Sequence, residues 1–265
     1  MPKQYIINTF TDRLFSGNPT AVCFFPDSWP SDELLLHIAR ENVLSHTAFI
    51  RPMGGTRYEL RWFTPTTEID LCGHPTLAAA FVITNFLTPE AEAVEFHTKG
   101  GILPVKKVGN MLEMDFPAYT LKQLEVTDEI ADALGVRPLE VWRARDLVCI
   151  FDDPQTIRDM KPDQDKLRRL KGALMQVTAP GDGPYDCVSR TFGPKMDMPE
   201  DPVCGSGHCH IIPYWAARTG RTKLVAQQAS PRGGVLYCRL EGERVILAGQ
   251  AHLYSISQLI LEETS

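Results

Sequence analysis

The sequence has no long apolar run, no excess of positive charge and no basic segment at its start. Its longest apolar run, Leu77 to Ile83, is far too short to cross a bilayer. The net charge of −6 gives no reason to expect nucleic acid or an anionic membrane as a partner. The N-terminus lacks a basic start followed by an apolar core, so we expect no signal peptide.

Cysteine is present in an odd number, seven in all, and no export signal is expected. Reduced thiols in a cytoplasmic protein are therefore the simplest interpretation. The chain has 265 residues, of which 43% are hydrophobic and 23% charged. These values are typical of a globular protein with one large or two ordinary domains.

Two short stretches of the sequence look like copies of each other. The first runs from Arg61 to Pro75 and the second from Arg190 to Gly207. Each reads Arg-x-Phe-x-Pro, followed by a short acidic loop and then Cys-Gly. Two shorter matches, Val22 with Val148 and Thr47 with Thr178, share nearly the same offset of about 130 positions. The pattern predicts a duplicated fold with one Cys-Gly turn in each half.

The expected elements support two similar α+β domains. Two helices, His74 to Phe86 and Ser206 to Arg218, have little or no polar face, which places them in the middle of a core. Pro213 should kink the second helix, and Gly220 should end it. We expect strands at residues 4–10, 20–25, 47–51, 57–63 and 111–116, and surface helices at 31–43 and 163–175.

The domain boundary is expected near Phe116 and Pro117, where one strand-like segment ends and a new segment begins. This gives an N-terminal domain of residues 1–116 and a C-terminal domain of residues 117–265. The last strand, near Ala251 to Leu261, is a candidate to return to the first domain.

Each Cys-Gly turn precedes a buried helix, and the first N–H groups of a helix form a natural anion site. Two such helix starts, related by duplication, suggest that a small carboxylate ligand binds in a cleft between the domains. Gly73, Gly205 and Gly207 would let the ligand approach the backbone closely.

The titratable side chains at these turns are candidates for moving a proton. They are Cys72 and His74 at the first turn, and Asp201, Cys204 and His208 at the second, where Ser206 adds a hydroxyl. A thiol at a helix N-terminus is expected to have a lowered pKa. Two thiols on opposite sides of a planar carbanion would transfer a proton from one face to the other. The alternative is that both cysteines are small buried fillers.

A metal site at the second turn is a further hypothesis. Cys204, His208, Cys209 and His210 are all ligand types, but their spacing fits no closed tetrahedral pattern. Cys209 and His210 would also point away from the helix face that carries the other two. We therefore expect no metal among these residues.

The sequence resembles the phenazine-biosynthesis PhzF-like family, within the diaminopimelate epimerase superfold, over nearly its whole length. The motifs that carry the resemblance are residues 15–19, 44–49, 61–65, 68–78 and 200–209. The family implies two pseudo-symmetric domains, each a curved, mostly antiparallel sheet or barrel around a central buried helix. It further implies a homodimer that needs no cofactor, and an isomerase that moves a proton on a small carboxylate or amino-acid-like substrate.

Two residues depart from the family pattern. The family's general acid/base is normally a glutamate, and His46 stands in its place here. The family often has threonine where this chain has Cys204. Together with Cys72, this residue resembles the catalytic cysteine pair of diaminopimelate epimerases and proline racemases.

Three functions follow from these residues. In the first, His46 is the base of an isomerase, since imidazole titrates near neutrality; Asp201 and His74 orient groups, and Ser206 binds substrate with the turn glycines. In the second, Cys72 and Cys204 act as the two thiols of an amino-acid racemase or epimerase. In the third, the chain is a binding protein that has kept the fold and lost the chemistry.

Overall fold

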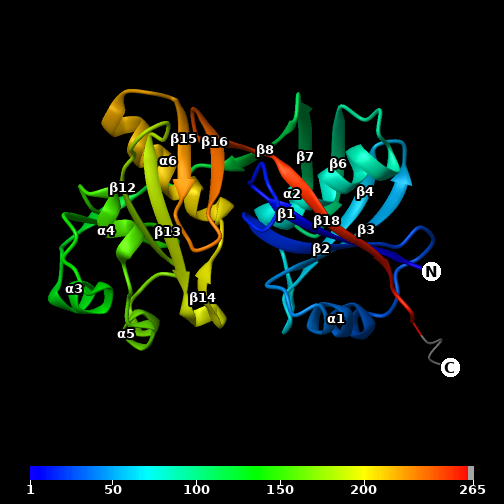
Figure 1. The fold of residues 1–265 in the computed structure, drawn as a ribbon, viewed down its shortest axis with the longest axis horizontal. Helices are drawn as coiled ribbons and strands as arrows, with labels where there is room; N and C mark the ends of the chain where they lie inside the picture. The colour runs from blue at the N-terminus through cyan, green and yellow to red at the C-terminus, as the bar shows by residue number, and fades with distance from the viewer. Residues whose placement is uncertain (262–265) are drawn as a thin grey trace. The chain divides into compact units, whose positions relative to one another are not determined.

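The computed structural model describes residues 1–261, which form two compact units (Figure 1). Among the described residues, unit 1 contains Met1–Asp115 and residues 248–261, and unit 2 contains Phe116–Leu247. The chain therefore leaves unit 1 once and returns to it for the last strand.

Unit 1 is a strand-rich unit with one buried helix. Strand β18 pairs antiparallel with β1, which pairs antiparallel with β2; β2 then runs parallel to β3. Strand β3 pairs antiparallel with β4, which runs parallel to β6, and β6, β7 and β8 form a meander. The elements are β1 (Lys3–Thr9), β2 (Asn18–Phe24), α1 (Asp32–Glu41), β3 (Thr47–Gly54), β4 (Arg57–Phe63), β5 (Glu68–Ile69), α2 (Gly73–Val82), the π-helical turn η1 (Ile83–Leu87), β6 (Ala93–Thr98), β7 (Gly101–Val108), β8 (Met111–Pro117, ending in unit 2) and β18 (Ala251–Gln258).

Helix α2 is the core of unit 1, because nearly all of its side chains are buried. It packs against β1, β2, β3 and β18. A run of alanines with Leu77 leaves no polar stripe to face water, so the helix can only be stable when it is enclosed. Helix α1 covers the opposite face of the same strands, where Leu35 and Ile38 pack with Phe49. Alternate residues of these strands therefore pack on opposite sides of the sheet, one set against α2 and the other against α1.

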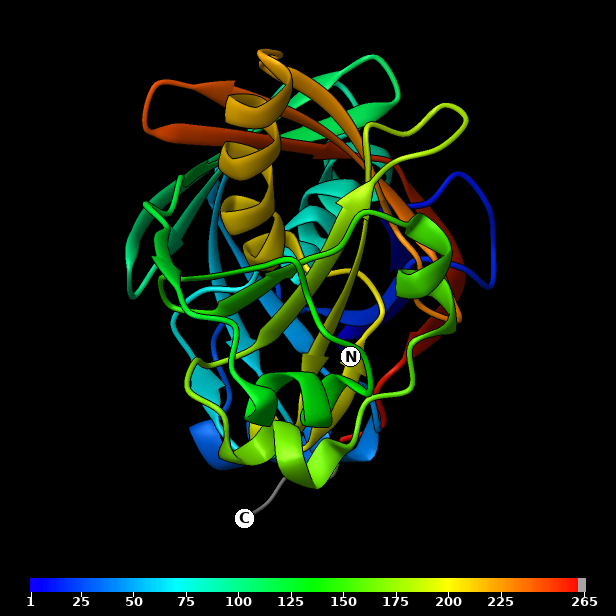
Figure 2. The ribbon, with the colours of Figure 1, turned by 90° about the vertical axis from the view of Figure 1, so that its left-hand side faces the viewer.

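Unit 2 repeats this architecture (Figure 2), in which the long gold helix is α6 and the short green to yellow-green helices are α3, α4 and α5. Strand β11 runs parallel to β12, β12 pairs antiparallel with β13, and β13 runs parallel to β15. The elements are β9 (Lys122–Leu124), α3 (Asp128–Leu134), β10 (Glu140–Arg143), β11 (Leu147–Ile150), α4 (Pro154–Asp159), α5 (Gln164–Arg169), β12 (Met175–Pro180), β13 (Cys187–Gly193), the 3-10 turn η2 (Pro194–Met196), β14 (Met198–Asp201), α6 (Gly205–Thr219), β15 (Lys223–Gln228), β16 (Gly234–Glu241) and β17 (Arg244–Gly249, ending in unit 1).

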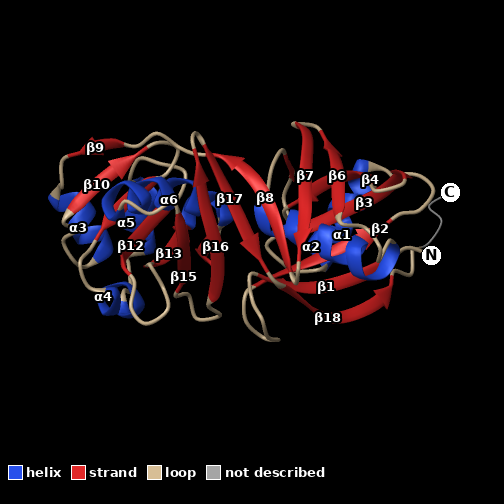
Figure 3. Cartoon of the chain, turned by 90° about the horizontal axis from the view of Figure 1, so that it is seen from above, coloured by secondary structure: helices blue, strands red, loops and turns tan. Residues whose placement is uncertain are grey.

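Helix α6 takes the place of α2 in unit 2 and packs against β12, β15 and β16. It runs through Pro213 and ends at Gly220, which has the left-handed conformation expected of a helix-ending glycine. Figure 3 shows that strands dominate both units, with α2 in one and α6 in the other. The predicted α+β class, with a central buried helix in each of two similar halves, is confirmed.

The duplication extends to single side chains. Arg61 binds Glu68 through two hydrogen bonds of 2.7 and 2.8 Å, and Arg190 binds Glu200 through two of the same lengths. In both cases the arginine lies in a central strand and the glutamate in the short strand that precedes the Cys-Gly turn. A bidentate arginine–carboxylate pair fixes the relative position of the two strands that carry it. The strand that leads into the Cys-Gly turn is therefore held by the same ion pair in each half.

Two expectations about the second half were wrong. The predicted surface helix over residues 163–175 ends at Arg169, because Gly172 has a positive φ of 106° and Met175 already begins β12. The predicted match of Thr47 with Thr178 is also wrong, because it is out of register with the strands. In the parallel pairs, Ala48 lies opposite Val22 and Gln176 lies opposite Val148. The structural counterpart of Ala48 is therefore Gln176.

Within residues 1–261, no helix is both long enough and apolar enough to cross a membrane.

Candidate functional site

The Cys-Gly turn of unit 1 places a thiol at the start of the buried helix α2. Cys72 is the N-cap residue, in an extended conformation, and within the described residues its side chain makes no capping hydrogen bond. Its carbonyl oxygen accepts a 2.6 Å hydrogen bond from Thr76 Oγ1, which also accepts one of 3.1 Å from Trp62 Nε1. The backbone of the turn is thereby fixed, and the sulfur is left to face His74, whose Nδ1 lies 3.8 Å away.

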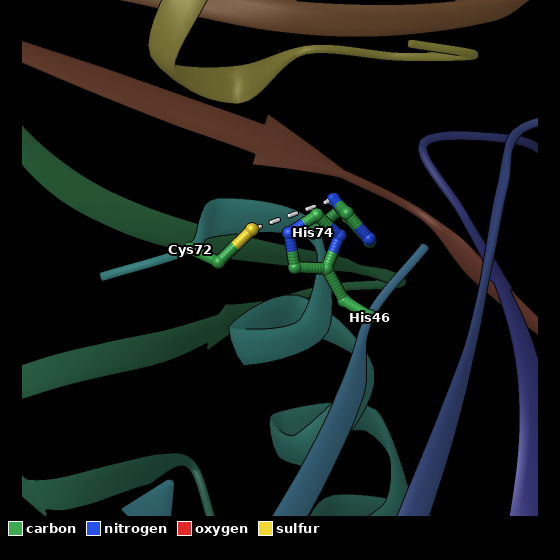
Figure 4. Close-up of side chains that lie close together, drawn as sticks. All are labelled: His46, Cys72 and His74. Carbon is green, nitrogen blue, oxygen red and sulfur yellow. Dashed lines mark hydrogen bonds between the residues drawn. The ribbon is translucent and has the colours of Figure 1, made fainter. Parts of the chain in front are cut away.

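His46 reaches the same point from the segment before β3. Thr20 Oγ1 donates a 2.8 Å hydrogen bond to the His46 carbonyl oxygen, which anchors this segment to β2. The His46 ring meets the His74 ring edge to face, with centroids 4.8 Å apart. Figure 4 shows both rings and the Cys72 sulfur gathered over the first turn of α2.

Each of these two rings has a buried nitrogen with no hydrogen-bond partner among residues 1–261. They are Nδ1 of His46 and Nε2 of His74. An unsatisfied polar atom in a protein interior costs about 1–3 kcal/mol, so natural structures keep few of them. Two such atoms in contacting side chains mark this place as a site rather than as ordinary core.

Burial determines the protonation of both rings. It lowers the pKa of His46 to about 4. Burial also holds the pKa of His74 well below its ordinary value, and repulsion from His46 adds to the effect. Both rings are therefore neutral at pH 7. The expectation that His46 titrates near neutrality is wrong for this environment, because the low dielectric disfavours the charged ring.

The second turn holds its cysteine differently. Cys204 is the N-cap of α6, and its sulfur accepts a 3.3 Å hydrogen bond from the Gly207 N–H. The Cys204 N–H donates to Gln228 Oε1 at 2.8 Å, and Gln228 Nε2 donates to the Asp201 carbonyl oxygen at 2.6 Å. This sulfur therefore caps its helix, unlike that of Cys72.

Burial raises the pKa of the Cys204 thiol well above its usual value, and the negative charge of Asp201 acts in the same direction. Hydrogen bonds from Ser206 and Gly207 lower it by less. The lowered pKa expected for a thiol at a helix N-terminus is wrong for Cys204, because desolvation outweighs the helix dipole. Cys204 is a protonated thiol at pH 7.

Ser206 leads into a buried polar network that the sequence analysis did not identify. Arg145 Nη2 donates a 2.9 Å hydrogen bond to Ser206 Oγ, and two 2.9 Å bonds join Arg145 to Asp146. The Asp146 carboxylate is fully buried and also accepts a 2.9 Å hydrogen bond from Gln176 Nε2. The detectable signal was Gln176 itself, an amide side chain between the apolar Met175 and Val177 of β12.

Gly207 is explained by this network. A β-carbon on Gly207 would collide with the side-chain amide of Gln176. Gly207 therefore leaves room for Gln176. This reason differs from the expected one, the close approach of a ligand to the backbone.

The remaining ligand-type side chains of the second turn are used within helix α6. His208 Nδ1 donates to the Cys204 carbonyl oxygen at 2.7 Å, and His210 Nδ1 donates to that of Ser206 at 3.0 Å. Cys209 Sγ donates to the Gly205 carbonyl oxygen at 3.6 Å. The His210 ring is stacked on Tyr119, with centroids 4.0 Å apart.

The predicted site residues thus fall into two groups. Unit 1 brings together His46, Cys72, Gly73 and His74 at the start of α2. Unit 2 brings together Asp201, Cys204, Gly205, Ser206 and Gly207 at the start of α6.

A duplicated unit with a buried central helix is also the fold of solved racemase and epimerase structures. A hydroxyproline epimerase from Agrobacterium vitis shares this fold with a TM-score of 0.65 at 11% identity; the match covers 100% of this chain and 92% of that one. The chain itself belongs to the phenazine biosynthesis-like protein family, PhzC-PhzF, which matches residues 7–255.

Two relatives within this family match almost end to end. An uncharacterized isomerase from Pseudomonas aeruginosa is 44% identical over 255 residues, which cover 96% of this chain and 97% of the relative. The crystal structure of a PhzF family protein from Enterococcus faecalis is 42% identical, with a TM-score of 0.95 and coverage of 98% and 99%. The predicted family is therefore confirmed.

Proposed function

We propose that this chain is a cofactor-independent isomerase that moves a proton on a carbon atom of a small carboxylate-bearing, amino-acid-like substrate. The family and the relatives named as isomerases support this reaction class. The single observation that carries the proposal is the contact between two neutral imidazoles, His46 and His74, each with an unsatisfied buried nitrogen. Such nitrogens are available to accept a proton from a substrate.

In this proposal His46 is the base. Its pKa of about 4 makes it neutral but weakly basic when no substrate is bound. A substrate carboxylate brought beside the ring adds a negative charge, which favours the imidazolium form and raises the pKa toward neutrality. The base is then strongest when the substrate is present. His74 contacts the His46 ring and positions it, while the neutral state of His74 avoids a second positive charge.

The substrate carboxylate is proposed to bind at the helix starts. Cys72 does not cap α2, so within the described residues the first N–H groups of that helix, beginning at Gly73, are left uncapped by its side chain. In unit 2 the hydroxyl of Ser206, held by Arg145, and the backbone of Gly205 form the second set of proposed contacts, whereas the Gly207 N–H already donates to the Cys204 sulfur. Asp201 has the role of orienting the groups at this turn.

A second mechanism, a two-cysteine racemase or epimerase, is favoured by the matched N-cap positions of Cys72 and Cys204. It requires one thiol and one thiolate at once. The raised pKa of Cys204 suits the role of the acid, and Cys72, whose sulfur lies 3.8 Å from His74 Nδ1, would supply the second thiol. Cys72 would then be the base.

The test is deuterium uptake from D2O into a panel of small amino acids, hydroxy acids and cyclic enamines. Exchange at carbon without added cofactor supports an isomerase. Ligand binding without exchange, detected by perturbed amide signals of Gly73 or Gly205, would instead indicate a binding protein that has lost the chemistry. An absence of both binding and exchange across the panel would count against the proposed substrate class.

A further inference from the structure

We propose that His46, Cys72 and His74 form a binding site for Zn²⁺, with three protein ligands and an open fourth position. Within residues 1–261 they are the group of three ligand-type side chains whose donor atoms converge, all within 4.8 Å of one another. Two donors come from the start of α2 and the third from the segment before β3 (Figure 4).

The separation of the donors suits zinc. Bonds of about 2.3 Å to sulfur and about 2.05 Å to nitrogen, arranged tetrahedrally, place sulfur and nitrogen about 3.6 Å apart. The Cys72 sulfur lies 3.8 Å from His74 Nδ1. Bringing the widest donor separation into the same range requires about 1 Å of side-chain movement, well within the reach of small torsional changes. Nitrogen and thiolate donors are the set that zinc prefers over magnesium or calcium.

The protein holds this group in advance. The carbonyl oxygens of His46 and Cys72 are fixed by hydrogen bonds of 2.8 and 2.6 Å, from Thr20 and Thr76 respectively. These bonds anchor the backbone of His46 and of Cys72. The backbone therefore needs little further ordering when an ion binds.

A second observation points independently to a ligand. Nδ1 of His46 is a buried atom without a hydrogen-bond partner among the described residues. Such an unsatisfied nitrogen is rare in a protein interior. Imidazole nitrogens are common ligands of a zinc ion, and on His74 the nitrogen that faces the Cys72 sulfur is Nδ1.

Entry of the ion is possible because His46 and Cys72 are only partly buried. When the ion binds, the Cys72 thiol loses its proton to solvent as the sulfur–zinc bond forms, and the two imidazoles bind as neutral donors. With three protein ligands, the fourth position is left for water or a carboxylate.

One consequence rests on the proposed function: a lone pair bound to zinc cannot accept a proton. Zinc should therefore inhibit proton exchange by His46, whereas zinc binding itself does not depend on that activity.

The experiment titrates the full chain, stripped of metal with a chelator and kept reduced, with zinc chloride in competition with a chromophoric zinc chelator. We expect one zinc per chain. Cys72→Ser and His74→Gln should each weaken the affinity by about 100-fold or more, since even outer-shell changes at metal sites cost 10–100-fold. The matched controls, His97→Gln in β6 and Cys204→Ser at the other turn, should leave the affinity unchanged.

Cobalt chloride provides a spectroscopic readout of the same site. A sulfur-to-cobalt charge-transfer band should appear in the parent chain and in Cys204→Ser, and should be absent in Cys72→Ser. Far-UV circular dichroism establishes that each variant is folded. If His74→Gln fails to fold, Cys72→Ser decides the question, since the sulfur is partly exposed and contributes little to the core.

Three results would overturn the proposal: no zinc retained against the chelator, an affinity unchanged by Cys72→Ser, or an affinity lost in Cys204→Ser. Zinc bound at this site in a chain whose metal-free form shows no proton exchange would refute the proposed isomerase and leave the metal site standing. Proton exchange in a metal-free chain that fails to bind added zinc would refute the metal site and leave the proposed isomerase standing.

Discussion

The ring of His46 meets the ring of His74 edge to face, at an interplanar angle of 80°. Two neutral rings tolerate this contact, whereas two imidazolium rings would repel each other across it. A proton on His46 therefore opposes a proton on His74, in agreement with the lowered pKa of the latter. Near neutral pH the two rings together can take up at most one proton beyond the N–H protons of their neutral forms. An acid/base that accepts and returns a single proton needs only that one.

The two proposed mechanisms are separated by substitution. If His46 is the base, His46→Ala should lower proton exchange by about 10²-fold or more, while Cys204→Ser should keep most of it. If the thiols act, the reverse should hold, because a serine hydroxyl is far too weak an acid to replace a thiol. The measurement is deuterium uptake per enzyme chain for each variant.

His46→Glu sharpens this comparison, because glutamate is the side chain that the family resemblance implies at this position. It should retain or raise the exchange rate. Exchange that survives in His46→Ala and disappears in His46→Glu would show that His46 is not the base, and would transfer the role to Cys72 and Cys204.

A pH-dependent stability is expected from His208. Burial lowers its pKa from an ordinary 6.5 to about 4 in the folded chain. Below pH 6.5 His208 is therefore protonated in the unfolded chain, whereas in the folded chain it becomes protonated only near pH 4. The free energy of unfolding should be at its full value above pH 6.5 and fall by about 3 kcal/mol as the pH drops through this window.

His208→Asn tests this expectation, since the asparagine amide can still donate to the Cys204 carbonyl oxygen that now accepts from the histidine. Its chemical denaturation, compared with that of the parent at pH 7 and pH 5, should show a smaller loss of stability. An equal loss in both proteins would mean that other groups carry the dependence.

The ion pair of Arg145 with the fully buried Asp146 should matter for stability. Arg145→Met leaves a buried carboxylate without its main partner and should lower the free energy of unfolding by about 3 kcal/mol. Arg137, which pairs with the exposed Asp128, is the matched control, and Arg137→Met should change stability by less than about 1 kcal/mol. Similar losses from both substitutions, measured by urea denaturation, would contradict the assigned role of burial.

Gly207→Ala tests the close approach of Gln176. A methyl group at this position collides with the amide, and such overpacking should destabilise the chain by about 1–3 kcal/mol. A methyl group at Gly100 meets only ordinary contact distances, so Gly100→Ala should be nearly neutral. Thermal unfolding of both variants makes the comparison, and equal midpoints would refute the steric explanation.

Much of the fold could be predicted from local patterns. The apolar run around Leu77 identified a buried helix, and Ser31 and Gly220 marked helix ends that the structure reproduces. These signals are local and depend on only a few neighbouring residues. The register between parallel strands is not local, which explains why the sequence pattern matches Thr47 with Thr178, whereas the strands place Gln176 at the position of Ala48.

The pKa values could not be predicted from position along the helix. The helix start suggested a lowered pKa for Cys204, and the residue type suggested a near-neutral pKa for His46. Both directions depend on how much water the fold excludes, and desolvation moves the two groups away from the expected values. The polar network around Asp146 was missed for a related reason, since Gln176 and Ser206 are distant in sequence from Arg145 and Asp146.

The pairing of β18 with β1 has a mechanical consequence. Lys3 lies opposite Gln258, and the Leu259 N–H donates to the Pro2 carbonyl oxygen, so both strands leave the sheet at the same end. A pulling force applied at residues 2 and 259 would load the hydrogen bonds between β1 and β18 one after another. It would not load all of them at once. Unit 1 would open from this edge at low force, before tension reached the strands of unit 2.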